Sequence, residues 1–76
     1  MLIYVKCVGT VKSLEEGPKI LPLEFKEQPS VSEVMRRLNL QEREVGFVLI
    51  NGRRANPESL LNDQDHLALI APLAGG

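Results

Sequence analysis

The sequence predicts an α+β fold, in which a mixed sheet of four to five strands is covered on one face by one main helix. Three patterns support this prediction: strand-like alternation near the N-terminus, a capped amphipathic helix in the middle, and two later apolar runs separated by turn residues. A single helix can cover only one face of such a sheet. The other face must therefore meet water or a partner.

The N-terminal segment is predicted to form a hairpin. Residues 2–8 alternate as a strand, with a core face formed by Ile3, Val5 and Cys7. The opposite face presents Tyr4, Lys6 and Val8. A turn at Gly17 and Pro18 leads to a second strand over residues 21–25. Because Pro22 has no amide hydrogen for a sheet ladder, we expect this strand at an edge of the sheet.

The middle of the chain carries the clearest helix signal. Ser30 can act as N-cap, and Glu33 can accept from the amide of Ser30, which is the reciprocal arrangement of a capping box. Apolar residues then recur at helical spacing: Val31, Val34, Met35 and Leu38. We expect a helix of about three turns that ends at Asn39, which suits the left-handed position after a helix, with Leu40 folding back as its hydrophobic contact.

The second half of the chain is predicted to be mainly strand. After a polar link over residues 41–44, the apolar run 47–50 stops at Asn51-Gly52, a dipeptide favoured in tight hairpin turns. This pattern predicts a third strand that turns into a short fourth strand.

The remaining elements complete one domain over residues 1–76. Residues 57–61 are interpreted as a single helical turn, residues 62–65 as a loop and residues 67–71 as a last apolar strand. We expect residues 72–76 to form a flexible C-terminal tail.

In the two apolar runs, apolar and polar residues do not alternate, although they should in a strand that has one solvent-exposed face. Our hypothesis is that an exposed apolar patch for docking is formed by Tyr4, Val8, Phe47, Leu49, Ala68 and Ile70. The alternative is that one of these strands is central and covered by loops. The sequence leaves both open.

Composition excludes several classes of function. The formal net charge is −1 and the nine Lys and Arg residues are spread along the chain, so we expect no nucleic-acid partner. The sequence lacks a signal peptide and any apolar run of bilayer length, which predicts a cytoplasmic protein that does not enter a membrane. No nucleophile-base pair or metal-ligand cluster can be assembled, so we expect neither an enzyme nor a bound cofactor or metal.

Four sets of residues have an ordinary structural explanation. Cys7 shares the core face of its strand and is interpreted as packing, and His66, which is alone, is placed at the start of the last strand. Asp63 and Asp65 are interpreted as turn formers. Arg53 and Arg54 are expected at a solvated hairpin tip, with contact to an acidic surface of a partner protein as the alternative.

Two glycines, Gly75 and Gly76, close the sequence. Glycine maximises chain freedom and adds nothing to packing, so a purely structural terminus has no need of them. Without side chains, a backbone carboxylate can enter a narrow active site. We therefore expect the carboxylate of Gly76 to be the reacting group, with Gly75 beside it.

Several motifs occur together along the chain. They are the order of strands and helix, the Asn51-Gly52 turn, the Leu61-x-Asp63-x-Asp65 loop and the ending Ala71-Pro72-Leu73-Ala74-Gly75-Gly76. Over the whole chain this combination resembles the MoaD and ThiS sulfur carriers, and the ending and length resemble MoaD more closely. The resemblance implies a ubiquitin-like β-grasp fold.

The resemblance also implies a function. An ATP-dependent activating enzyme similar to MoeB or ThiF would adenylate the Gly76 carboxylate, and a persulfide donor would convert it to a thiocarboxylate. ATP would be used by that enzyme. A MoaE-like large synthase subunit would then receive the tail, including Pro72 and Leu73, and pass the sulfur to a pterin precursor of molybdopterin. Val8 and Ile70 match apolar positions that such carriers use for docking.

Departures from the family pattern keep other functions open. The common Asp-Gly-Asp loop is Asp63-Gln64-Asp65 here, and apolar residues that often follow the Asn-Gly turn are replaced by Arg53 and Arg54. A different partner, or a role in thiamin synthesis, is therefore open. A ubiquitin-like modifier joined through Gly76 to lysines would use the same activation chemistry. A β-grasp interaction module without covalent chemistry would not need the two glycines.

Overall fold

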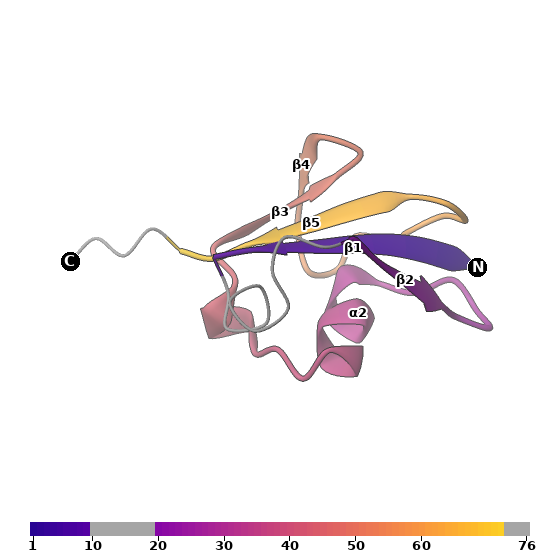
Figure 1. Cartoon of the computed structure of the whole chain (residues 1–76), viewed down its shortest axis with the longest axis horizontal. Coiled ribbons are helices and arrows are strands. Elements are labelled where there is room, and N and C mark those ends of the chain that lie inside the picture. The colour runs from indigo at the N-terminus through magenta and orange to yellow at the C-terminus, as the bar shows by residue number, and fades with distance from the viewer. Residues whose placement is uncertain (10–19, 73–76) are drawn as a thin grey trace.

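A computed structural model describes residues 1–9 and 20–72 of the chain, and it contains a five-stranded mixed sheet with one α-helix (Figure 1). The elements in chain order are β1 (Leu2–Val8), β2 (Ile20–Glu24), α2 (Val31–Arg37), the 3₁₀ helix η1 (Glu42–Glu44), β3 (Phe47–Ile50), β4 (Arg53–Ala55) and β5 (His66–Ile70). The predicted fold class is confirmed.

The order of strands across the sheet is β2-β1-β5-β3-β4. Strand β1 pairs antiparallel with β2 and parallel with β5, and β3 pairs antiparallel with both β5 and β4. Strand β2 is therefore an edge strand, as the proline predicts, with Pro22 opposite Tyr4. Strand β5 lies in the centre of the sheet.

The hydrophobic core lies between the sheet and α2, which packs on one face (Figure 1). The predicted alternation of β1 is confirmed, because Ile3 and Val5 are fully buried and Cys7 is 6% exposed. The sheet also contributes Leu67 and Leu69 of β5 to this core. Helix α2 contributes Val31, Val34 and Met35. Phe25, directly after β2, is also buried.

Helix α2 is held at both ends by the predicted residues. The hydroxyl of Ser30 accepts from the amide of Glu33, and the Glu33 carboxylate accepts from the amide of Ser30, so the capping box is present. At the other end Asn39 has a φ of 59°, and Leu40 is buried. The helix has seven residues and is shorter than predicted. Leu38, which was expected inside the helix, is its C-cap.

Several predicted segments differ from the structure. Residues 57–61 do not form a helical turn: the chain bends at Pro57 and Glu58, and Leu60 then pairs with Ser30 in an isolated bridge. The carbonyls of Ser59 and Pro57 accept from the first amides of α2, so this segment satisfies donors that a helix leaves without internal partners. The predicted polar link over 41–44 contains η1, and the last strand begins one residue earlier than predicted and ends one residue earlier.

Candidate functional site

The face of the sheet opposite α2 brings the predicted patch residues together. Strand pairing places Ile70 opposite Val8 on one side and opposite Phe47 on the other. The next row in the same direction contains Ala68, with Lys6 and Leu49 as its neighbours. Val8 is 42% exposed, and the other apolar members of these rows are half-buried. We call this set the sheet patch: Val8, Phe47, Leu49, Ala68 and Ile70.

Tyr4 lies on the same face but farther from the rest. It pairs with His66 at the opposite end of β5, and the two rings stack with centroids 4.8 Å apart. Four residues along a strand span about 13 Å, so Tyr4 and Val8 mark opposite ends of the face. His66 lies at the start of the last strand, as predicted.

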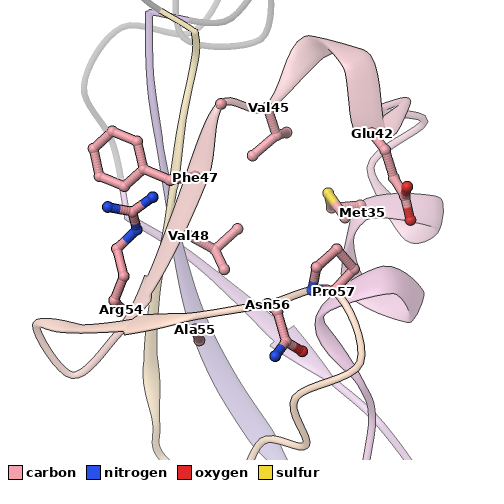
Figure 2. A pocket seen from close by; sticks show the side chains of 10 residues that line it. Met35, Glu42, Val45, Phe47, Val48, Arg54, Ala55, Asn56 and Pro57 are labelled. Atoms are coloured by element: carbon pink, nitrogen blue, oxygen red, sulfur yellow. The ribbon is translucent and has the colours of Figure 1, made fainter.

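Arginine 54 borders the sheet patch. Its guanidinium lies beside the Phe47 ring (Figure 2), with 4.7 Å between the guanidinium carbon and the ring centroid. Arg54 also pairs with Leu49 across β3 and β4. Arg53 and Arg54 are both exposed, but they belong to β4, and Arg54 covers an aromatic ring instead of reaching freely into solvent. A positive charge therefore stands at the edge of the patch, and Lys6 supplies a second within it.

The chain leaves the sheet beside the first row of the patch. The amide of Ala71 donates to the carbonyl of Val8 at 2.9 Å, and the amide of Gly46 donates to the carbonyl of Ile70 at 2.6 Å. Pro72 is exposed and passes against Gly46. The other predicted tail residues, Leu73, Gly75 and Gly76, lie outside the described residues.

Gly46 takes part in this exit and was missed by sequence reasoning. The signal that could have found it is a glycine placed directly before an apolar strand and outside any predicted turn. The residue that explains it, Pro72, is distant in sequence and becomes its neighbour only through the pairing of β3 with β5.

The two aspartates of the 62–65 loop form turns, as predicted. The carboxylate of Asp65 accepts from the amide of Asn62 and from the side chain of Asn51, whose own oxygen accepts from the amide of His66. The carboxylate of Asp63 accepts from the amide of Leu2 at 2.7 Å. The loop thus ties the start of β5 to the β3–β4 turn and to β1, at the end of the sheet away from the tail.

A small hollow lies on the other side of β3, between α2 and the β3–β4 hairpin. Figure 2 shows Val45 and Val48 pointing toward Met35 and Pro57 in this hollow, whereas Phe47 and Arg54 lie on the opposite side of the strand. The polar side chains on the side of the hollow are those of Glu42 and Asn56. These side chains are not a nucleophile-base pair.

Residues 1–9 and 20–72 contain no group of three or more His, Cys, Asp or Glu side chains placed to hold a metal ion. Within the same residues, no helix is long and apolar enough to cross a membrane.

The five-stranded arrangement with one helix is that of the ubiquitin-like β-grasp proteins, and two solved structures share it over the full length of both chains. SAMP1 from Haloferax volcanii superposes with a TM-score of 0.74 at 21% sequence identity, with 100% of each chain covered. A chain of the protein–protein complex of subunits 1 and 2 of the molybdopterin-converting factor from Helicobacter pylori superposes with a TM-score of 0.59 at 24% identity, also with 100% of each chain covered. At these identities the likeness concerns the fold alone.

A sequence model of the ThiS family matches residues 6–76, and the chain belongs to this family of small, non-catalytic sulfur carriers. A comparison with curated protein sequences gives no significant match.

Proposed function

We propose that the carboxylate of Gly76 is adenylated by an activating enzyme and then converted to a thiocarboxylate that donates its sulfur in molybdopterin synthesis. A carboxylate is a poor electrophile until it carries a good leaving group, and the adenylate supplies one. The terminal sulfur of a persulfide donor then attacks the acyl adenylate and releases AMP. A second thiol cleaves the resulting acyl disulfide, which frees the thiocarboxylate and leaves the donor sulfur in a disulfide with that thiol. The chain carries the reactive group, and its partners supply the catalysis.

The observation that carries this proposal is the match of the ThiS family to residues 6–76, which includes the two final glycines. The position of the sheet patch adds a physical reason. Val8, Ile70 and Phe47 form the row beside which the chain leaves the sheet. A partner that docks on this row therefore binds next to the root of the tail and can receive Gly76 in its active site.

The choice of molybdopterin rests on the MoaD-like ending Pro72-Leu73-Ala74-Gly75-Gly76. The similar Helicobacter pylori chain comes from a complex of two molybdopterin-converting subunits. We propose that this chain likewise binds a MoaE-like large subunit through the sheet patch and the tail residues Pro72 and Leu73. Tyr4, at the far end of the same face, completes the proposed docking surface. We further propose that the chain binds no cofactor itself and acts in the cytoplasm.

The test is intact mass spectrometry after incubation with ATP, a MoeB- or ThiF-like activating enzyme, a persulfide donor and a thiol reductant. We expect a species in which one oxygen is replaced by sulfur. The matched control is a chain that ends at Ala74, which keeps every described element and should gain no sulfur. Absence of the sulfur species with each activating enzyme tried, under conditions in which a known carrier reacts, would contradict the proposal.

A second assay separates the pathway from the chemistry. The thiocarboxylate form is mixed with a MoaE-like subunit and a pterin precursor, and formation of the dithiolene product is followed. Sulfur loading without pterin conversion would keep the carrier function and reject the molybdopterin role. Isopeptide-linked conjugates of higher mass in a lysate would favour the protein-modifier alternative.

A further inference from the structure

We propose that Gly46 is a positioning residue for the C-terminal tail, and that its missing side chain sets the direction in which the chain leaves the sheet. The inference rests on the proposed function, because the direction of the tail matters only if Gly76 reacts inside another protein. Nothing in the family match or in the fold comparisons assigns a role to this residue.

The first observation is the close approach of the chain at Pro72. A β-carbon on residue 46 would lie 2.7 Å from the Cα atom of Pro72, 2.9 Å from its nitrogen and 3.2 Å from the carbonyl carbon of Ala71. Carbon atoms in contact normally stay about 3.5–4.0 Å apart. All three atoms belong to the backbone, so no side-chain rotation can relieve the overlap.

The second observation is that backbone conformation does not require glycine here. Among the described glycines, Gly9 and Gly52 have a positive φ, and Gly46 does not. In contrast, a β-carbon on Gly52 would meet nothing within 4 Å. Gly46 therefore provides space, whereas Gly52 provides a left-handed turn conformation.

The third observation is that the neighbouring backbone is held in place. The amide of Gly46 donates to Ile70, and the amide of Ala71 donates to Val8, so the end of β5 is bonded to β3 on one side and to β1 on the other. A side chain at position 46 must break this bonding or displace Pro72. Proline fixes its own φ near −65° and restricts the residue before it, so Ala71 and Pro72 cannot readily rotate to absorb the overlap, and the point from which the tail starts must shift.

The expected effect is on catalysis and not on docking. The sheet patch keeps its side chains when residue 46 changes, so the KM for the carrier should stay within about two-fold of wild type. The Gly76 carboxylate would reach the active site misdirected, and a misplacement of about 1 Å can cost on the order of a hundred-fold in rate. We expect kcat for thiocarboxylate formation to fall at least ten-fold in Gly46→Ala and further in Gly46→Val.

The matched control is Gly52→Ala. It also introduces strain, because Gly52 has a φ of 83°, but this turn lies away from the tail. It should lower the unfolding temperature and leave kcat unchanged at a temperature where the protein is folded. A rescue variant completes the set: Gly46→Ala with Pro72→Gly frees the root of the tail. Replacing proline with glycine raises the entropy of the unfolded chain, so a partial recovery of kcat, measured at a temperature where every variant is folded, would reflect tail direction and not a general gain in stability.

Each outcome decides the matter. A wild-type chain that gains no sulfur would reject the proposed function and this inference together. A wild-type chain that is activated, with Gly46→Ala giving the same kcat, would overturn the inference alone. A raised KM with unchanged kcat would make Gly46 a docking residue, and failure of Gly46→Ala to fold would make it a folding residue. Both of these results also overturn the inference.

Discussion

Ile70 lies directly opposite Val8 in the parallel β1–β5 ladder, and the next residue along the chain, Ala71, donates its amide to the carbonyl of the same Val8. An apolar pair on the open face of the sheet and the last anchored residue before the tail are thus neighbours. A protein that binds this pair is placed at the root of the tail.

Ile70→Lys should weaken binding to the activating enzyme and to a MoaE-like subunit while the fold is retained. Burial of an apolar side chain contributes about 1.5–3 kcal/mol, which corresponds to roughly ten- to a hundred-fold in affinity. Calorimetric titration measures the change. Leu60→Lys is the matched control, because Leu60 is 58% exposed and lies beside the N-terminus of α2, away from the sheet patch. Equal affinity and oligomeric state for wild type and Ile70→Lys would reject the docking role of the patch.

Arg54→Glu should slow association with the activating enzyme by roughly three- to ten-fold at low salt, because a charge at the rim of an interface acts mainly on the association rate. The difference should shrink as salt screens the charge. Stopped-flow mixing at several ionic strengths measures it. Arg37→Glu is the control: Arg37 also covers an aromatic ring, at 4.3 Å from Phe25, but it belongs to α2. An identical effect of both substitutions would reflect net charge alone and contradict the account.

Gln64→Gly should stabilise the fold by about 0.5–1 kcal/mol, because Gln64 has a φ of 69°, where a β-carbon is strained and glycine is not. Denaturant unfolding measures the change. Gln64→Ala keeps the β-carbon and should show no such gain. A loss of stability in Gln64→Gly would mean that the side chain contributes contacts that outweigh the strain.

Ser30→Ala should lower the free energy of unfolding by about 1 kcal/mol, because it removes the N-cap side chain that accepts from Glu33. Ser32→Ala, at the second residue of α2, replaces serine with the best helix former and should cost little. Thermal unfolding of the two variants side by side tests the assignment. Similar losses for both would contradict the role of the capping box.

Local patterns were enough to predict most of the fold. The alternation of Ile3, Val5 and Cys7, the Ser30–Glu33 capping box and the Asn51-Gly52 turn each depend on neighbouring residues, and each is present in the structure. Asn51 and Gly52 have positive φ values of 52° and 83°, the left-handed pair that this hairpin turn requires.

The parts that were not predicted depend on residues distant in sequence. Residues 57–61 look helical by themselves, but their carbonyls accept from amides at the start of α2. Two further contacts likewise arise only once the strands pair: Arg54 lies over the Phe47 ring, and Pro72 lies against Gly46. Sequence patterns identified the sheet patch because alternation fails there, but not the charge beside it or the glycine behind the tail.

The most direct test of the central claim is to locate the sulfur on the chain. The carrier is incubated with ATP, an activating enzyme, a thiol reductant and a persulfide donor labelled with a heavy sulfur isotope, and its fragments are analysed by tandem mass spectrometry. We predict the label on Gly76, as a thiocarboxylate. Label on Cys7, or a chain that stays unlabelled while a known carrier reacts, would contradict the account.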